Sequence, residues 1–257
     1  MRAVKIVLCA AIVWLVAGVF ASAQDSPSIT ASSDFFSKYV WRGQLLVNDW
    51  VAQPSVSVGY KGFTASIWSN FCLTDEIDAK NEFTEFDYSL DYTAAIPGLD
   101  PVSFSLGTIY YRFPNQPFEP TLEVYGGLSA DIPLSPAVKV FYDVGDSLDQ
   151  DKIEGNYIQF SIGHSIEKIQ KWTEECYCDL CLGASLGVGT AGYDKGYFGV
   201  DNAALNDLTL SAALPIALGK WTIKPQVGYS TMLDSDIRAA TDKSDNLYGG
   251  IGASFQF

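Results

Sequence analysis

The chain has 257 residues, of which 14% are aromatic and only 18% are charged, and its formal net charge is -14. This acidic balance excludes nucleic acid as a partner, because binding to phosphates needs clustered Lys and Arg. The long-range field of such a chain attracts cations instead. Abundant aromatics and 22 glycines with few charges are typical of amphipathic strands joined by short turns, as in membrane barrels.

The first residues contain the parts of a secretory signal peptide. Two basic residues, Arg2 and Lys5, precede an apolar run and an A-S-A cleavage signal that ends at Ala23. We therefore predict a signal peptide over residues 1–23 and a mature domain over residues 24–257. No later apolar run approaches the roughly 20 residues that a membrane helix needs, so a membrane role requires strands.

The last residues, N-L-Y-G-G-I-G-A-S-F-Q-F, alternate between an apolar face and a polar face. Such a strand leaves unpaired backbone groups at an edge unless it pairs with the first strand and closes a barrel. The terminal Phe257 resembles the end of bacterial outer-membrane barrel proteins, where the last strand also serves as an assembly signal. We therefore expect the outer-membrane bilayer and the barrel assembly machinery as partners. The alternative is the last strand of a soluble sandwich.

Strand-like segments recur along the whole chain, and turn signals such as Lys61-Gly62 and Pro97-Gly98 separate them. We predict an all-β fold, a transmembrane antiparallel β-barrel of about twelve strands. An even number is expected when both termini lie on one side of the membrane. The predicted strands cover residues 29–42, 51–60, 63–74, 84–94, 102–113, 121–131, 138–144, 156–166, 180–190, 207–217, 221–232 and 246–257.

The clearest alternation is T-E-F-D-Y-S-L-D-Y-T-A at residues 84–94. Its aromatic and aliphatic side chains, including Tyr88 and Leu90, share one parity and are predicted to face lipid. The other parity holds carboxylates, which in a barrel face the lumen. The same reasoning on other strands predicts these pore-lining residues: Asp34, Lys38, Arg42, Glu85, Asp87, Asp91, Glu123 and Asp143, with Asp131, Lys139, Asp207 and Lys224 on the same face.

Connection lengths test the strand assignment, because outer-membrane barrels have short periplasmic turns and longer outside loops. The connections after predicted strands one, three, five, seven, nine and eleven are the longer ones, and an acidic loop runs from Asp146 to Glu154. The exception is E-K-I-Q-K-W-T-E-E at residues 167–175, where a short turn is expected. A displaced strand boundary and a small periplasmic flap are both compatible with it.

Four cysteines belong to the mature chain: Cys72 and the C-x-C-x-x-C run of Cys176, Cys178 and Cys181. In an oxidising compartment, a disulfide between two of the three clustered thiols is expected over metal ligation, because no His is near and structural sites usually gather four ligands. We predict no metal site. Cys72 is expected near the opposite end of a barrel about 25 Å tall, beyond disulfide reach.

The only histidine, His164, precedes Ser165, a pair that invites comparison with outer-membrane phospholipases that use His and Ser. A serine nucleophile needs its base within hydrogen-bond reach. Adjacent residues on a strand point to opposite faces, so His164 cannot easily serve Ser165. We therefore predict that the chain is not an enzyme and that His164 is structural or interfacial. A Ser on a neighbouring strand is the alternative partner.

The segment D-F-F-S-K-Y-V-W-R-G at residues 34–43 resembles the opening strand of the TorF-type porins, an outer-membrane family. The likeness continues in Q-P-S-V-S-V-G-Y-K-G-F at residues 53–63, in Y-Y-R-F-P-N at residues 110–115, and in the L-S-P hairpin. The resemblance implies a single outer-membrane barrel with a pore, and it supplies no catalytic residues. Residues 167–175 and the cysteine cluster fall outside the family pattern.

Three functions are compatible with these patterns. The leading hypothesis is a porin-like channel for passive diffusion of small solutes, made cation-preferring by Glu85, Asp87 and Asp91. The first alternative is a plugged structural or adhesive barrel whose lumen carboxylates pair with Lys and Arg; a lipid hydrolase is the second. Barrels of about eight strands are filled and those of 16 to 18 leave a channel, so about twelve lies between. No hypothesis requires a cofactor.

Overall fold

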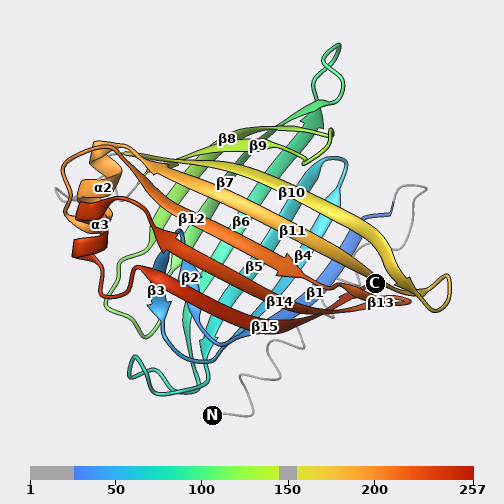
Figure 1. The fold of residues 1–257 in the computed structure, drawn as a ribbon, viewed down its shortest axis with the longest axis horizontal. Helices are drawn as coiled ribbons and strands as arrows, with labels where there is room; N and C mark the ends of the chain where they lie inside the picture. The colour runs from blue at the N-terminus through green and yellow to red at the C-terminus, as the bar shows by residue number, and fades with distance from the viewer. Residues whose placement is uncertain (1–25, 145–154) are drawn as a thin grey trace.

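The computed structural model describes residues 26–144 and 155–257, which form a closed antiparallel β-barrel of twelve spanning strands (Figure 1). The predicted signal peptide at residues 1–23 and the acidic loop at residues 145–154 lie outside the described residues. In barrel order the strands are β1 (Ser28–Phe36), β4 (Val51–Tyr60), β5 (Phe63–Cys72), β6 (Glu82–Ala95), β7 (Val102–Arg112), β8 (Thr121–Ala130), β9 (Ala137–Asp143), β10 (Asn156–Lys171), β11 (Cys176–Gly189), β12 (Ala204–Ala213), β14 (Trp221–Met232) and β15 (Asp245–Gln256).

The barrel closes through two pairings. Strand β1 pairs with β15, and β10 pairs with β11, so neither sheet edge is left open. A short strand, β13 (Ile216–Leu218), continues β12 after a break, since both pair with β11 and β14. The break falls at Pro215, which has no backbone N–H to donate to a ladder.

The two faces of the strands follow the predicted alternation. On β6, Leu90 is 49% exposed on the outer surface, as predicted for a lipid-facing residue. Its neighbour Ser89 points inward and shares a hydrogen bond with the Ser66 hydroxyl of β5. Phe35 on β1 and Phe63 on β5 are likewise exposed outward. The register predicted from period-two alternation is therefore confirmed on these strands.

The first predicted strand is wrong at its end. It was expected to cover residues 29–42, but β1 stops at Phe36 and the chain turns back as a hairpin of β2 (Tyr39–Trp41) and β3 (Gln44–Val47). Figure 1 shows this hairpin within the outline of the barrel. Lys38 and Arg42 therefore do not line the wall as residues of strand one. Lys38 precedes the hairpin, and Arg42 is at its tip.

The tip of this hairpin is a two-residue turn made by Arg42 and Gly43. Both have positive φ angles, 45° and 81°, as two-residue hairpin turns require. A Cβ atom at position 43 would lie 2.6 Å from the Cβ of Asp207 and 2.7 Å from the sulfur of Met232. Glycine is therefore needed here both for the backbone conformation and for the close approach to the wall.

The long connections lie at one end of the barrel, and two of them contain helices that were not predicted: α2 (Ala191–Phe198) and α3 (Ser235–Ala240). Helix α2 ends at Gly199, in the left-handed conformation with φ 71°. Asp234 caps α3 by accepting hydrogen bonds from the N–H groups of Asp236 and Ile237. Among the described residues, no helix combines the length and the apolar character needed to cross a membrane.

Of the two explanations for residues 167–175, the structure supports a displaced strand boundary, since most of them extend the strand predicted to end at residue 166. Strand β10 continues to Lys171 and β11 begins at Cys176, so the two strands form a long hairpin that projects beyond the end carrying the C-terminus (Figure 1). The register shifts between Ile166 and Gln170, where Lys168 has a φ of 51° and donates its N–H to Asp179 Oδ1. This bulge bends the extension away from a regular ladder.

Candidate functional site

The inner hairpin, defined as residues 39–47, crosses the full width of the lumen. It follows β1, and the strand order places β9 opposite β1, with β8 and β10 beside it. Arg42 at the tip contacts Glu123 on β8, Phe141 on β9 and Tyr157 on β10. The hairpin therefore forms a bar from one wall to the other.

The Arg42–Glu123 pair fixes the tip of the bar. Arg42 Nη1 and Nη2 donate to the two Glu123 carboxylate oxygens at 2.7 and 2.8 Å, and the side chains are 7% and 2% exposed. Tyr111 donates its hydroxyl to Glu123 Oε2 at 2.8 Å. Parallel charge-assisted bonds of this kind compensate part of the cost of removing two charges from water.

Aromatic rings surround the guanidinium on its remaining sides. Its central carbon lies 4.4 Å from the ring centroid of Trp41, 4.5 Å from that of Phe141 and 4.4 Å from that of Tyr157. The Tyr193 centroid, from α2, lies 6.0 Å away. Each ring presents its electron-rich face to a cation within the distance at which such contacts are favourable.

Helix α2 closes the site from the end that bears the long loops. The rings of Tyr193 and Tyr197 pack in a tilted arrangement with centroids 4.4 Å apart, and the Tyr197 centroid lies 5.6 Å from that of Trp41. Asn206 holds the helix by donating to Asp194 at 2.6 Å. Burial raises the pKa of the Asp194 carboxyl, and the hydrogen bond from Asn206 opposes that rise.

The flanks of the bar are packed as well. Tyr39 donates its hydroxyl to Glu85 Oε2 on β6 at 3.0 Å. On that side an apolar cluster fills the lumen: Tyr39, Val47, Val51, Cys72 and Ala79, with Phe36, Trp41, Trp68 and Ile77 against it. On the other side Gly43 lies against β12 and β14. The lumen is therefore constricted at the level of the inner hairpin.

The lumen nearer the chain termini, here called the vestibule, has a different lining. Small hydroxyl side chains face inward from neighbouring strands and bond to one another, as in the 2.8 Å contact of Ser32 with Ser55. Six serines of this lining are half-buried, so solvent reaches them: Ser32, Ser55, Ser66, Ser89, Ser161 and Ser185. Such short side chains occupy little of the volume at the centre of the barrel.

Charged side chains in the vestibule are partly paired. Asp34 lies 3.5 Å from the Lys224 ammonium and accepts a 2.6 Å hydrogen bond from Gln226. Asp91 accepts from the Tyr125 hydroxyl at 2.6 Å, and the Lys139 ammonium lies 4.8 Å from the centre of the Tyr125 ring. These groups remain in contact with solvent.

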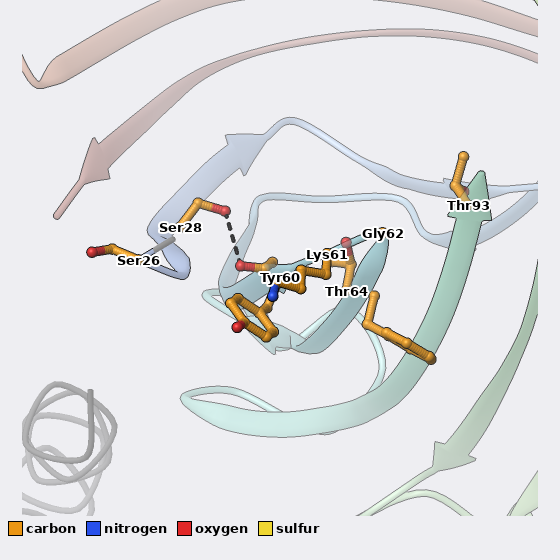
Figure 2. Close-up of a pocket in the computed structure, with 9 residues that line it drawn as sticks. Ser26, Ser28, Tyr60, Lys61, Gly62, Thr64 and Thr93 are labelled. Atoms are coloured by element: carbon orange, nitrogen blue, oxygen red, sulfur yellow. Dashed lines mark hydrogen bonds between the residues drawn. The ribbon is translucent and has the colours of Figure 1, made fainter. Parts of the chain in front are cut away.

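A cleft of about 610 Å³ lies at the rim of the vestibule, beside the Lys61-Gly62 turn (Figure 2). Its polar lining includes Ser28, Thr64 and Thr93, and the Ser28 hydroxyl donates to the Gly59 carbonyl at 3.5 Å. The lining continues the hydroxyl-rich surface of the vestibule to the mouth of the barrel.

The predicted pore-lining residues divide between the two levels. Asp34 and Asp91 are in the vestibule. Glu85, Glu123 and Asp143 are 6%, 1% and 5% exposed at the level of the inner hairpin.

Near Glu85, Asp87 has one carboxylate oxygen, Oδ1, that is buried without a hydrogen-bond partner in the described part of the chain. Asp143 accepts from Thr121 at 2.6 Å and from Tyr197 at 3.3 Å.

Lys38 sits between β1 and β2, where partial burial and the neighbouring Lys243 lower the pKa of its amine. Of the other residues expected in the lumen, Asp207 is buried and accepts from Tyr157 at 2.8 Å. Asp131 lies in the turn after β8 and is not on a strand.

Sequence reasoning missed the aromatic residues of the constriction, namely Tyr39, Trp41, Tyr111, Tyr157 and Tyr193. The sequence does contain one sign of the inner hairpin. The R-G pair at residues 42–43 lies between two short strand-like runs and, like the K-G pair at residues 61–62, is a basic residue followed by glycine. That pattern predicts a hairpin where a continuous strand was expected.

The expected disulfide is absent: Cys72, Cys176, Cys178 and Cys181 are all free thiols. Residues three apart on a strand point to opposite faces, which separates Cys178 from Cys181. The described residues contain no group of three or more His, Cys, Asp or Glu placed to hold a metal ion.

His164 and Ser165 lie on opposite faces of β10. His164 is paired with Leu182, which is 45% exposed on the outer surface, whereas the Ser165 hydroxyl lies 3.4 Å from Cys181. This separation, predicted from strand geometry, leaves Ser165 without His164 as a base.

Two solved structures have a similar architecture. The NanC porin matches 89% of this chain and 100% of its own, with a TM-score of 0.55 and 16% identity. An outer membrane channel from Pseudomonas putida F1 matches 93% of this chain and 98% of its own, with a TM-score of 0.51 and 7% identity. No protein-family model and no curated protein matches the sequence. At these identities the similarity establishes the fold, which is that of an outer-membrane β-barrel.

Proposed function

We propose that the chain is a porin-like outer-membrane channel that passes small solutes by diffusion and is constricted by its inner hairpin. The observation that carries the proposal is the vestibule, where the inward-facing side chains include small, half-buried serines. A barrel built only for structure has no need of such a lining, because bulky inward side chains would fill it and add stability. The similarity to a porin and to an outer membrane channel supports the same function.

The proposal includes a place and partners for the chain. The end with short turns and the termini faces the periplasm, and the long loops with α2 and α3 face outward, as in other barrels of this class. Delivery uses the signal peptide at residues 1–23, and insertion uses Phe257 as the signal for the barrel assembly machinery. The likeness of residues 34–43 and 53–63 to TorF-type porins supports assignment to that family.

We further propose that the channel prefers cations. Glu85 and Asp87 lie beside the inner hairpin, and Asp91 follows them along the same face of β6 into the vestibule. Rows of carboxylates attract cations, and a low-dielectric wall strengthens their field. Asp34 contributes less, because Lys224 lies 3.5 Å from it.

Planar-bilayer recordings on the refolded mature protein test both proposals. Discrete current steps are expected, with a reversal potential under a salt gradient that reports cation preference. Replacing Glu85 with Gln and both Asp87 and Asp91 with Asn should reduce that preference clearly. Asp34→Asn is the matched control and should change it less. An unchanged reversal potential in the triple variant would contradict the role of this row.

The second candidate is a plugged structural or adhesive barrel. The observation in its favour is the packing on both flanks of the inner hairpin, where Tyr39, Val51 and Cys72 are buried. The same recordings separate the two functions. A folded native barrel without current, together with current once the inner hairpin is replaced by a short Gly-Ser loop, would support the plugged barrel.

A further inference from the structure

We propose that the wall opposite β1 carries a binding site for solutes that contain a guanidinium group, and that the inner hairpin occupies this site with its own Arg42. Arg42 is then an internal ligand that free guanidinium compounds can replace. Binding at this site requires only the folded barrel, whereas a role in transport rests on the proposed channel function.

Most of the site belongs to the wall and not to the hairpin. Glu123 is on β8, Tyr111 on β7, Phe141 on β9, Tyr157 on β10 and Tyr193 on α2. The hairpin itself supplies Trp41 and the guanidinium. A movement of residues 39–47 away from the wall would therefore leave a carboxylate and these four aromatic residues in place around an empty volume the size of the Arg42 head group.

The chemistry of the wall selects a planar fork over a simple ammonium. The two Glu123 oxygens accept parallel N–H bonds at 2.7 and 2.8 Å, and Tyr111 orients the carboxylate from its other side at 2.8 Å. Phe141 and Tyr157 have their ring centres 4.5 and 4.4 Å from the guanidinium carbon. A guanidinium fills a bidentate, stacked site of this kind, whereas a lysine-like ammonium has a single nitrogen, which cannot form two parallel bonds to the carboxylate, and has no plane to stack on the rings.

One buried polar atom in the site is only partly used. The Tyr193 hydroxyl, on a side chain that is 2% exposed, accepts no well-aligned hydrogen bond within the described residues, although the Arg42 guanidinium is close enough to interact with it electrostatically. Arg42 uses two of its N–H groups on Glu123. A free guanidinium compound is not restrained by the hairpin backbone, so it can turn to donate a further N–H to this oxygen.

Competition with a tethered group sets the concentration at which a solute should act. A side chain held by a short loop faces its site at an effective concentration on the order of millimolar or above. Free guanidinium compounds should therefore enter the wild-type site only at comparable concentrations. Removing the Arg42 side chain removes the competitor and should expose the site to much lower concentrations.

Calorimetric titration of the full-length mature protein, refolded in detergent, tests the site with methylguanidinium as the probe. The Arg42→Ala variant should bind it saturably, at one site, and at least about tenfold more tightly than the wild type does. Methylammonium, which has the same charge without the fork, should bind at least about tenfold more weakly. The Arg42→Ala, Glu123→Gln double variant should lose the saturable binding.

A heat-modifiable gel band checks that each variant is folded. If Arg42→Ala does not fold, a variant with residues 39–47 replaced by a Gly-Ser loop keeps the wall and is titrated in its place. A folded variant with no saturable binding, or equal binding after Glu123→Gln, overturns the proposal. Binding without current in either protein supports the site and contradicts the channel function instead, so the two failures are distinguishable.

Discussion

At the level of the inner hairpin, the wall presents large aromatic and ionisable side chains that are almost fully buried, whereas in the vestibule neighbouring positions on the strands present half-buried serines. Strand β6 shows both behaviours on one face, four residues apart: Glu85 is 6% exposed against Tyr39, and Ser89 shares a hydroxyl contact with Ser66. The difference shows that strand number fixes the diameter of the barrel, whereas the size of the inward side chains determines at which level the lumen is filled.

Deletion of the last residue changes only the vestibule end of the barrel. Among the variants considered, we expect it to have the largest effect, a loss of assembly. Phe257 contributes one backbone hydrogen bond, to the Ile29 carbonyl at 3.0 Å, and a half-exposed ring packed on Phe255. Such contacts are worth only about 1 to 3 kcal/mol, too little to unfold a barrel. We nevertheless expect deletion of Phe257 to abolish outer-membrane assembly, because recognition of the last strand is lost.

A heat-modifiable band in outer-membrane fractions measures this assembly, and refolding of the same variant in detergent is the control. Normal insertion without Phe257 would disprove the recognition role.

The buried ion pair at the constriction and the solvent-accessible pair of serine hydroxyls in the vestibule should differ in their contribution to stability. Arg42→Ala strands the Glu123 carboxylate, which is 1% exposed, and should cost about 3 to 5 kcal/mol of unfolding free energy. Ser89→Ala removes one half-buried hydroxyl contact and should cost about 0.5 to 1.5 kcal/mol. Urea unfolding in lipid vesicles measures both. Similar losses would show that the two levels of the lumen are equally packed.

A third test separates the two faces of one strand. Arg in place of Leu90, which is 49% exposed on the outer surface, should cost about 2 to 4 kcal/mol if it lies near the bilayer midplane. Arg in place of Ser89 enters the wet vestibule and should cost much less. The same vesicle assay applies, and equal costs would contradict the assigned lipid-facing surface.

The smallest effect concerns ion selectivity. Asp91 is in the vestibule, on the path of ions through the proposed channel, whereas Asp87 has a buried oxygen at the constriction. Asp91→Asn should therefore shift the reversal potential more than Asp87→Asn does. A larger shift for Asp87→Asn would place the selective region at the inner hairpin and not in the vestibule.

Much of the barrel follows from local alternation. Predicted and observed bounds coincide for β4, and β6 was expected at residues 84–94 against an observed Glu82–Ala95, because period-two patterning is a property of neighbouring residues. The inner hairpin differs, since its position depends on Glu123, 81 residues away in sequence from Arg42. A pattern in residues 34–43 cannot report that partner. Helix α2 was missed because its sequence, A-G-Y-D-K-G-Y-F, contains two glycines that disfavour helices.

The sequence predicted which carboxylates belong to the candidate site, but not how they are arranged in space or which of them are buried. Parity predicted Asp34 and Asp91 on the same face of the wall, and the structure adds their contacts with Lys224 and Tyr125. Parity cannot tell an exposed carboxylate from one covered by another part of the chain. The burial of Glu123 could therefore be seen only in the three-dimensional structure.

The extended hairpin of β10 and β11 makes it possible to determine the orientation of the barrel in the membrane by labelling a cysteine. The ladder between β9 and β10 ends at Ser161, so the hairpin tip stands beyond that neighbour. Cys176 begins β11 near this tip and is partly exposed, while Cys72 is buried near the opposite end. A membrane-impermeant maleimide too bulky to pass the constricted lumen can therefore reach Cys176 only from the compartment that the termini face, and labelling of Cys176 in sealed cells reports which side of the membrane that is.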